Sequence, residues 1–296
     1  MPQKRIVVAG ATGYLGREVL QAFHNNGFLV RALARNPQKL DDLKDSCESI
    51  FVGEATKKET LKGLFEDVDI VFSSIGLRSF SRKPSLWDVD YQANMNLLEE
   101  AKKTGVKHFI FISAFRMNEK ENRRRILFAE ARERVADAII ESGMTWNIIR
   151  PNGFFNDMAE FFDMAKTGTV YLIGSGKTLI NPIHGADLAS RIVSCASDPS
   201  QHNQAIPCGG PDIFSMSQIA ELAFETLNAK PKIRKIPSFF LSLGYFLTIP
   251  FNPNMASFLR FFQLVMTTPK IVAPQWGDHH LKDFFQELLE KSTSNN

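Results

Sequence analysis

The sequence predicts an α/β fold in which a doubly wound parallel sheet carries a small C-terminal α+β lobe. Short apolar runs alternate with longer amphipathic runs along the first two-thirds of the chain, which is typical of β-α-β units with helices on both faces of a sheet. A glycine-rich turn joins the first apolar run to the first amphipathic run. With 296 residues, the chain is long enough for about two domains of roughly 150 residues each.

The first half of the chain contains the predicted strands and helices of the main sheet. Each strand is a short apolar run, and each helix shows apolar residues at helical spacing and is closed by a glycine. The predicted strands are residues 6–9, 28–34, 49–52, 69–73, 108–113 and 145–149. The predicted helices are residues 14–25, 86–104 and 119–141. Pro151 ends the last of these strands.

Beyond Pro151 the pattern is less regular and predicts a mixed lobe. We expect strands at residues 170–173, 178–180, 204–208 and 232–236, and helices at residues 185–197, 215–228 and 281–290. Residues 238–268 are rich in Phe, Leu and Met and are interrupted by Pro250 and Pro253, which favours two apolar helices. The expected domains are therefore residues 1–155, and residues 156–296 as a substrate or partner lobe interleaved with the last core strands.

Composition excludes several classes of protein. Hydrophobic residues make up 44% and charged residues 23%, which excludes a disordered chain. The balance of 35 Lys and Arg against 32 Asp and Glu does not predict a nucleic-acid partner. The three cysteines are far apart, which favours a reducing, cytoplasmic location without disulfides. The most apolar stretch, residues 239–249, is about half the length of a membrane-spanning helix, so we expect no transmembrane segment.

The clearest chemical signal is the run GATGYLG at residues 10–16, which lies directly between a predicted strand and a predicted helix. Glycines in this position allow a tight turn and a close approach of the backbone to a pyrophosphate, which then meets the exposed N–H groups of the helix start. A simple packing turn is the alternative interpretation. The context of strand, turn and helix favours a dinucleotide site.

The end of the second strand predicts which dinucleotide binds. An Asp or Glu there would hold a ribose 2′-hydroxyl and select NAD(H), but the sequence reads VRALARNPQK. Arg35, with Lys39 shortly after it, would instead meet the 2′-phosphate of NADP(H). Arg31 lies on the same face of the strand, although Arg35 is nearer the strand end. We expect NADP(H) in preference to NAD(H), and a solvated strand end is the alternative.

Several motifs together resemble the NmrA-like atypical short-chain dehydrogenase/reductases over about residues 4–235. They are GATGYLG, VRALARNPQKL, VDYQANMNLLEEAKKTGVKHFIFIS, IIESGMTWNIIRPNGFF and PIHGADLA. The resemblance implies a Rossmann fold that binds NAD(P) in residues 1–155, followed by a small lobe. Members of the family include reductases, quinone oxidoreductases and redox-sensing regulators without turnover, so the resemblance does not fix one function.

The resemblance also implies where the cofactor makes its contacts. The pyrophosphate would be lined by Gly10, Thr12, Gly13, Tyr14, Leu15 and Gly16. The 2′-phosphate would meet Arg35 and Lys39. The adenosine ribose would lie near Ser74, Ile75 and Gly76. The nicotinamide would lie near Pro151, Asn152, Gly153 and Phe154.

The catalytic residues of active short-chain reductases are only partly present. Such enzymes place Tyr and Lys four residues apart on the helix after the fifth strand, so that the Tyr donates a proton to the reduced carbonyl. Counting back from the sixth strand, these positions fall on Phe128, which has no proton to give, and Arg132, which can act only as a fixed charge. Ser113, at the end of the fifth strand, is where the family's Ser would touch substrate.

Each of these candidates also has a structural interpretation. Phe128 continues an apolar helix stripe, and the arginines of RRRILFAEARER are typical of a solvated helix face. Asn94 fits either a bend in the preceding helix or a place near the active site. His184 and Asp187 at a helix start favour structure, and the adjacent His279 and His280 point in different directions and lack a third ligand. We predict no metal.

Three hypotheses follow. The first is an NADPH-dependent oxidoreductase that passes hydride to a small apolar, quinone-like acceptor, which needs no positioned acid. The second is a non-catalytic, NADPH-sensing regulatory protein. The third is an assembly protein that uses the Phe-rich residues 238–262 as an interface, through which the chain could also form an oligomer. We prefer the first because hydride transfer belongs to the cofactor and needs mainly positioning.

Overall fold

The computed structural model describes residues 3–294, which form two compact units. Unit 1 comprises Met1–Arg150 and Leu188–Ile206, and unit 2 comprises Pro151–Asp187 and Pro207–Asn296. Unit 1 contains most of the main sheet and its covering helices, whereas two small sheets and an apolar helical hairpin belong to unit 2.

Unit 1 is built on a seven-stranded sheet with the order β3-β2-β1-β4-β5-β6-β9, in which β1 to β6 pair in parallel. The strands are β1 (Arg5–Ala9), β2 (Leu29–Ala34), β3 (Ser49–Val52), β4 (Ile70–Ser73), β5 (His108–Ile112), β6 (Thr145–Pro151) and β9 (Gln204–Cys208). The strand order reverses between β1 and β4, and ligands bind at such a switch point in open α/β sheets. The predicted doubly wound Rossmann-type sheet is therefore confirmed.

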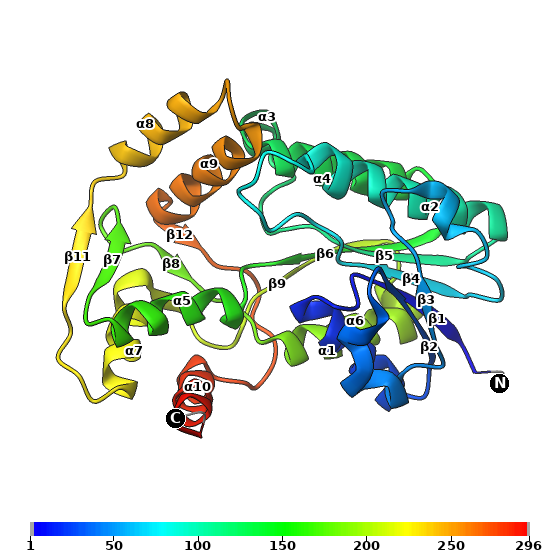
Figure 1. The fold of residues 1–296 in the computed structure, drawn as a ribbon, viewed down its shortest axis with the longest axis horizontal. Helices are drawn as coiled ribbons and strands as arrows, with labels where there is room; N and C mark the ends of the chain where they lie inside the picture. Colours follow the sequence, from blue (N-terminus) through cyan, green and yellow to red (C-terminus); the bar gives the residue numbers. More distant parts are fainter. Residues whose placement is uncertain (1–2, 295–296) are drawn as a thin grey trace. The chain divides into compact units, whose positions relative to one another are not determined.

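Helices cover both faces of this sheet. Figure 1 shows α1 (Tyr14–Asn25) and α6 (Gly185–Ser197) on one face, and α2 (Ala93–Thr104) and α4 (Leu127–Ile140) on the other. The cluster beneath α2 and α4 includes Val71 and Phe109 from the sheet and Leu97 and Val135 from the helices, all of them fully buried. Because helices cover both faces, every residue of β5 is buried, as expected for an interior parallel strand.

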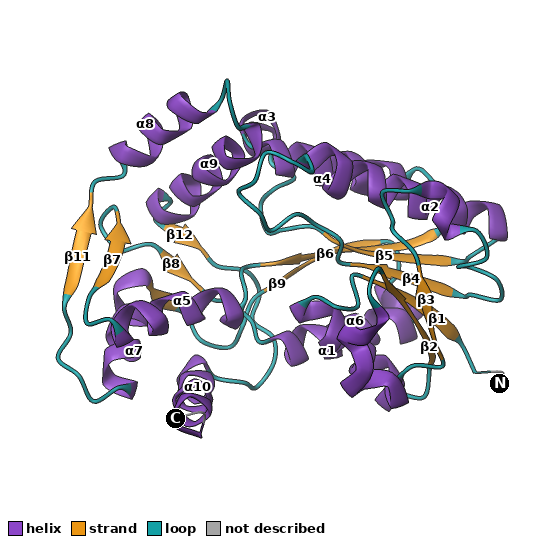
Figure 2. Ribbon diagram, in the orientation of Figure 1, coloured by secondary structure: helices purple, strands orange, loops and turns teal. Residues whose placement is uncertain are grey.

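Unit 2 consists of short strands and helices. Its strands are β7 (Val170–Ile173), β8 (Leu179–Ile180), β10 (Phe214–Ser215), β11 (Ile233–Ile236) and β12 (Lys270–Ile271). Its helices are α5 (Phe155–Lys166), α7 (Met216–Thr226), α8 (Phe239–Thr248), α9 (Pro253–Thr267) and α10 (Leu281–Ser294). The strands form the sheets β10-β8-β12 and β11-β7. Figure 2 shows β7, β8, β11 and β12 as short arrows. No helix within residues 3–294 is long and apolar enough to cross a membrane.

Three sequence predictions need correction. The single helix expected over residues 119–141 is divided into α3 (Lys120–Arg125) and α4, because Ile126 has the extended conformation φ −121°, ψ 110°. The helix expected from residue 86 begins with a π-helical turn, Trp87–Gln92, before α2. Helix α5 was not predicted, although its buried residues Phe155, Met158 and Phe162 have helical spacing.

A buried histidine in β5 makes folding sensitive to acid. The His108 ring contacts Asn147 Oδ1 at 2.8 Å, and burial lowers the pKa of His108 to about 4. The unfolded chain binds a proton at this residue near its usual pKa of about 6.5, whereas the folded chain does not. The stabilising contribution is therefore complete above about pH 6.5 and is lost as the pH falls toward 4.

We expect the free energy of unfolding to fall by about 2 kcal/mol between about pH 7 and about pH 5 because of the proton that His108 binds in the unfolded chain. His108→Gln keeps a hydrogen-bonding amide but cannot titrate, so its profile should be flatter by that amount. The measurement is urea unfolding of both proteins at the two pH values. An identical pH dependence in the variant and the original chain would contradict the assignment.

Candidate functional site

The glycine turn between β1 and α1 depends on close backbone packing. Gly10 has φ +89°, and its carbonyl accepts a hydrogen bond from the Gly13 N–H at 2.9 Å. A Cβ on Gly16 would overlap that same carbonyl, because the first turn of α1 lies directly against the turn. A Cβ on Gly13 would meet only the Gly10 oxygen, at 3.3 Å. Gly16 is thus required by packing, whereas a Cβ at Gly13 would make one tight contact with the Gly10 oxygen and would meet no other atom within 4 Å.

The start of α1 is suited to hold an anion. Its N-cap is Gly13, which offers no side chain to cap the helix, and its first turn contains no acidic residue. The first three residues of the helix are Tyr14, Leu15 and Gly16, and the exposed Thr12 precedes the cap. Helix N-termini carry partial positive charge and outward-facing N–H groups, so this end of α1 favours a phosphate group.

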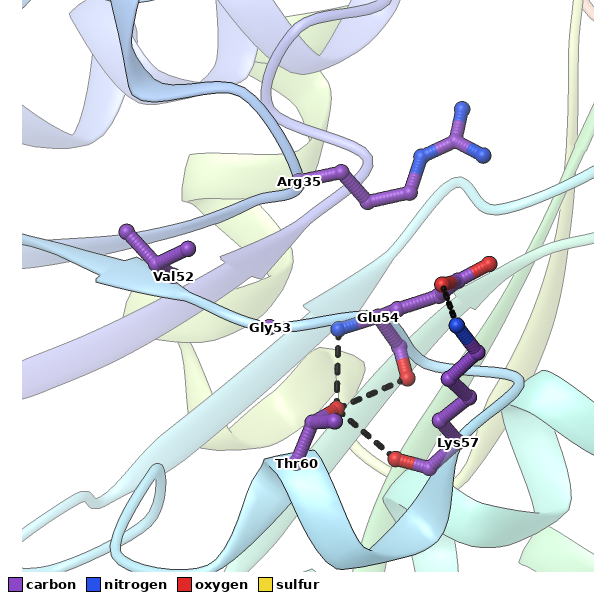
Figure 3. A pocket seen from close by; sticks show the side chains of 6 residues that line it. All are labelled: Arg35, Val52, Gly53, Glu54, Lys57 and Thr60. Atoms are coloured by element: carbon purple, nitrogen blue, oxygen red, sulfur yellow. Dashed lines mark hydrogen bonds and ion pairs between the residues drawn. The ribbon is translucent and has the colours of Figure 1, made fainter.

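A second group of residues lies at the carboxyl ends of β2 and β3. Arg35, Gly53, Glu54 and Lys57 line an open pocket of about 230 Å³, together with Val52 and Thr60. Figure 3 shows Arg35 on one side of this pocket and the Glu54–Lys57 pair on the other. Lys57 Nζ lies 3.0 Å from the Glu54 carboxylate, and this hydrogen bond lowers the Glu54 pKa. Two cations thus share the pocket with one carboxylate.

The lysine predicted from sequence and the lysine that lines the pocket lie on different segments. Lys39, predicted from sequence, lies in the 3₁₀ helix Pro37–Ser46 after β2, and its carbonyl accepts a hydrogen bond from Arg17 at 2.9 Å. Lys57, which was not predicted, is the lysine that lines the pocket with Arg35. Arg31 donates from Nη1 to the Leu64 carbonyl at 2.7 Å. Of Arg31 on β2 and Arg35 directly after it, Arg35 is therefore the one that borders the pocket.

The end of β4 packs on the glycine turn. Ser74 N–H donates to the last carbonyl of β1 at 3.1 Å, and a Cβ on Gly10 would lie 2.7 Å from the Ser74 hydroxyl and 3.4 Å from the Ile75 nitrogen. A Cβ on Gly76 would overlap the guanidinium group of Arg132. The structure thus brings the predicted ribose residues to the glycine turn on one side and to Arg132 on the other.

Arg132 is a fixed positive charge at this edge of the sheet. Its Nε donates to Asp90 Oδ1 at 2.8 Å, and its Nη1 donates to the Ile112 carbonyl at 3.2 Å. Asp90 also accepts from the Leu77 N–H at 2.9 Å. Burial raises the pKa of the Asp90 carboxyl, and the charge of Arg132 opposes that shift. The carboxylate and the strand end therefore hold the guanidinium against Gly76.

Ser113 is part of a buried ionic network. Its hydroxyl donates to Glu133 Oε1, and Arg150 donates to both carboxylate oxygens of Glu133, at 2.6 and 2.7 Å. All three side chains are buried. The interpretation of RRRILFAEARER as a solvated helix face is therefore wrong for Glu133, and also for Arg132, which is largely buried. A substrate contact by Ser113 stays a prediction.

Two further residues of this region have structural surroundings. Phe128 is buried on α4, as are Val135 and Ile139. Asn94 accepts a hydrogen bond from Ser73 at 2.6 Å and donates to the Asp90 carbonyl at 2.9 Å, where the π-helical turn passes into α2. Asn94 therefore stabilises the irregular start of this helix.

Four residues predicted to lie near the nicotinamide belong to unit 2: Pro151, Asn152, Gly153 and Phe154. Asn152 is buried, its N–H donates to the Cys208 carbonyl at 2.9 Å, and its side-chain amide donates to Asn181 Oδ1 at 2.7 Å. Gly153 has φ +83°, and its carbonyl accepts from the Ile183 N–H at 3.1 Å. These contacts fix the turn after β6, and its role toward a nicotinamide stays a prediction.

Two histidines of unit 2, His279 and His280, contact carboxylates. His279 Nδ1 lies 2.7 Å from Asp187 Oδ1, and the His279 ring stacks on His184 at 4.3 Å. His280 Nδ1 lies 2.8 Å from Asp212 Oδ2, so the two adjacent histidines do point apart. No group of three or more His, Cys, Asp or Glu among residues 3–294 could hold a metal ion. That the protein has no metal stays a prediction.

Sequence reasoning missed five charged residues at this edge of unit 1: Glu54, Lys57, Asp90, Glu133 and Arg150. A signal existed for Glu133, because the small residues Ala129 and Ala136 mark the same side of α4 as buried. Glu54 and Lys57 follow β3 in a segment without helical or strand periodicity, so their side chains could not be placed from sequence.

Comparison with known proteins identifies the family. A family model described as NAD(P)H-binding matches residues 10–199, which covers more than half of the chain. A relative from Arabidopsis thaliana, a chloroplastic divinyl chlorophyllide a 8-vinyl-reductase, is 31% identical over 249 residues, or 78% of this chain. The alignment covers 60% of that relative's length. Its name places it in the chloroplast, so a cytoplasmic location for this chain stays a prediction.

Two further comparisons concern an assembly factor that is similar in sequence and a solved structure that is similar in fold. The photosystem II assembly factor Ycf39 of Trieres chinensis is 24% identical over 266 residues, with 88% of this chain and 81% of that protein covered. The crystal structure of the NADPH-dependent quinone oxidoreductase QOR2 from Escherichia coli, complexed with NADPH, matches 96% of this chain and 99% of its own. Its TM-score is 0.71 at 15% identity, a likeness of fold. With the family model, these findings show that the chain belongs to the NAD(P)H-binding family of atypical short-chain dehydrogenases/reductases that its motifs resemble.

Proposed function

We propose that this protein is an NADP(H)-dependent oxidoreductase that passes hydride to a small, apolar, conjugated acceptor of the quinone type. The observation that carries the proposal is the uncapped start of α1, where Gly13 and a first turn without acidic residues leave space and positive potential for a pyrophosphate. A Cβ at Gly13 would intrude on that space, as expected of a cradle for a close-lying phosphate group.

The charges beside β2 and β3 support NADP(H) over NAD(H). A 2′-phosphate in the pocket beside Arg35 and Lys57 would meet two cations and one carboxylate. The balance is positive, and no acidic residue ends β2 to hold a ribose hydroxyl. Lys39 remains a further candidate for the phosphate.

The acceptor class follows from the groups available at the carboxyl ends of β4 and β5. The bound nicotinamide would supply the hydride, while the chain binds and orients both reactants. Arg132 is held by Asp90 and stays charged, so it can stabilise negative charge but cannot release a proton. Phe128 has no proton to donate. A quinone or similar conjugated acceptor becomes a delocalised, weakly basic anion that takes its proton from water.

Residues 156–296 would form the lobe that receives the acceptor, and the turn Pro151–Phe154 would lie near the nicotinamide. The names of the relatives support acceptors with delocalised electrons, since one is a vinyl reductase and another a quinone oxidoreductase. The Ser113 hydroxyl would contact the acceptor only if it gave up its hydrogen bond to Glu133 and donated to the acceptor instead.

One observation favours a second function, a non-catalytic protein that responds to NADPH. The Ser113 hydroxyl is bound to the buried Glu133–Arg150 pair, so none of the three positions of a Ser, Tyr and Lys site offers a ready proton donor. The similarity to a protein named as an assembly factor agrees with this alternative. NADPH binding would then order the chain for a partner.

Arg35→Ala should weaken NADPH binding by about 10–100-fold and leave NADH binding nearly unchanged, because only NADPH carries the 2′-phosphate. Comparing Lys57→Ala with Lys39→Ala identifies which lysine contacts the 2′-phosphate together with Arg35. Binding of both cofactors is measured by calorimetric titration. Glu54→Gln should strengthen NADPH binding, since it removes the carboxylate from the pocket. An equal loss of affinity for NADPH and NADH in Arg35→Ala would show that Arg35 does not contact the 2′-phosphate.

Gly13→Val and Gly16→Ala should fail in different ways. Gly13 has φ −83°, which any residue adopts, so Gly13→Val should fold and yet lose nucleotide binding. Gly16→Ala should lower the unfolding free energy by about 1–3 kcal/mol, because its Cβ overlaps the Gly10 carbonyl. Thermal unfolding and calorimetry distinguish the two. Normal NADPH affinity in a folded Gly13→Val protein would reduce the motif to a packing turn.

Steady-state NADPH oxidation should be efficient with a benzoquinone and at least about 100-fold slower with a matched cyclic ketone, which needs a positioned acid. Asp90→Asn/Arg132→Met removes the fixed charge without leaving a buried carboxylate alone, and should lower kcat with the quinone while NADPH affinity is kept. Efficient ketone reduction would mean that another residue is the acid. Tight NADPH binding with neither acceptor reduced would favour the non-catalytic function.

A further inference from the structure

The α8–α9 hairpin, residues 239–267, presents an unusual apolar surface. Helix α8 has the sequence FFLSLGYFLT and contains no buried residue, and Figure 2 shows it beside α9 and joined to it by a short connection. The exposed apolar side chains of the hairpin are Phe239, Phe240, Leu243, Phe246, Leu247, Ile249, Phe251 and Met255. Soluble surfaces rarely gather so many large apolar side chains in one place.

The polar groups of the hairpin lie between its helices instead of facing outward. Gln263 Nε2 on α9 donates to Ser242 Oγ on α8 at 2.6 Å, and Arg260 Nη1 donates to Gln263 Oε1 at 2.7 Å. The Arg260 guanidinium also lies 5.3 Å from the centre of the Tyr245 ring. The hairpin therefore satisfies its polar side chains internally and exposes phenylalanines, the reverse of the arrangement that water favours.

The sequence segment that contains the hairpin carries charges of one sign only. Residues 226–277 contain six basic residues and no Asp or Glu: Lys230, Lys232, Arg234, Lys235, Arg260 and Lys270. The remainder of the chain carries 29 basic against 32 acidic residues, so this segment accounts for the positive net charge. Arg234 and Lys235 are exposed on β11, directly before α8. None of the six forms an ion pair with an acidic side chain among residues 3–294.

We propose that the α8–α9 hairpin binds the surface of an anionic lipid bilayer. The exposed phenylalanines of α8 and its connection to α9 enter the boundary between headgroups and acyl chains, and the exposed lysines and arginines meet the anionic headgroups. The helices have 10 and 15 residues, which suits a hairpin that lies in the interface rather than one that crosses the bilayer.

Charge complementarity favours a bilayer over a second copy of the chain. In a twofold-symmetric dimer the same surface meets itself, which would bring two sets of unpaired cations together without a carboxylate to neutralise them. An anionic bilayer neutralises these cations and buries the phenylalanines in one step. The proposal does not depend on whether the protein turns over its cofactor.

Sedimentation of the full chain with lipid vesicles tests the proposal. Vesicles of phosphatidylcholine mixed with phosphatidylglycerol should bind the chain at least about tenfold more strongly than vesicles of phosphatidylcholine alone. Phe246→Glu/Phe251→Glu should lower binding by at least about tenfold. These side chains are 68% and 73% exposed, so the variant should fold, as checked by NADPH binding and thermal unfolding. The matched control is Ile140→Glu, at a 42% exposed position of α4 in unit 1, which should bind vesicles like the original chain.

Several results would overturn the proposal. Equal binding to neutral and anionic vesicles, or undiminished binding of the double variant, would remove the hairpin or its charges from the interaction. No vesicle binding, with a dimer that Phe246→Glu/Phe251→Glu dissociates in analytical ultracentrifugation, would assign the surface to a second copy. No vesicle binding by a monomer would leave the surface to a protein partner.

Discussion

The candidate site depends on one close backbone contact, in which the first turn of α1 lies against the carbonyl of Gly10. Only a residue without a side chain fits at Gly16, because a Cβ there would overlap that oxygen. The contact fixes the start of α1 at the carboxyl end of β1, where the strand order of the sheet reverses. Ser74 closes on the same turn from β4. The helix start, the β2 and β3 pocket and the end of β4 therefore share one edge of unit 1.

Buried charges organise the rest of this edge. Asp90, in the turn before α2, holds the guanidinium of Arg132 on α4, and Glu133 on α4 holds that of Arg150 on β6. The first pair therefore joins the two helical elements, and the second joins α4 to the sheet. A buried pair adds little net stability compared with apolar packing, but it fixes side-chain positions firmly. Chemically, each pair is neutral overall and supplies no acid, because a guanidinium group does not release its proton at neutral pH and the Ser113 hydroxyl is bound to Glu133. This favours acceptors that need electrostatic stabilisation and no proton donor.

The fold was predictable where local patterns and long-range packing agree. Strands such as β5 are short apolar runs between glycine-closed helices, and the turn after β1 carries its own motif, so the main sheet followed from the sequence. The break at Ile126 was not predictable, since nothing in the local sequence marks its extended backbone. Asp90 was equally hidden, because a charged residue appears buried only when its partner, here 42 residues away, is known, whereas the neighbouring Ala129 and Ala136 gave a signal for Glu133. Lys57 was hidden because tertiary structure alone brings it to Arg35.

We propose that unit 1 recognises a dinucleotide through its 2′-phosphate. The most direct test is calorimetric titration of the unaltered chain with 2′-phospho-ADP-ribose and with ADP-ribose, which lack the nicotinamide. We expect one site for each ligand and at least about tenfold tighter binding of the phosphorylated one, since a charge-assisted contact contributes about 1.5–3 kcal/mol. Equal affinities, or tighter binding of ADP-ribose, would contradict it.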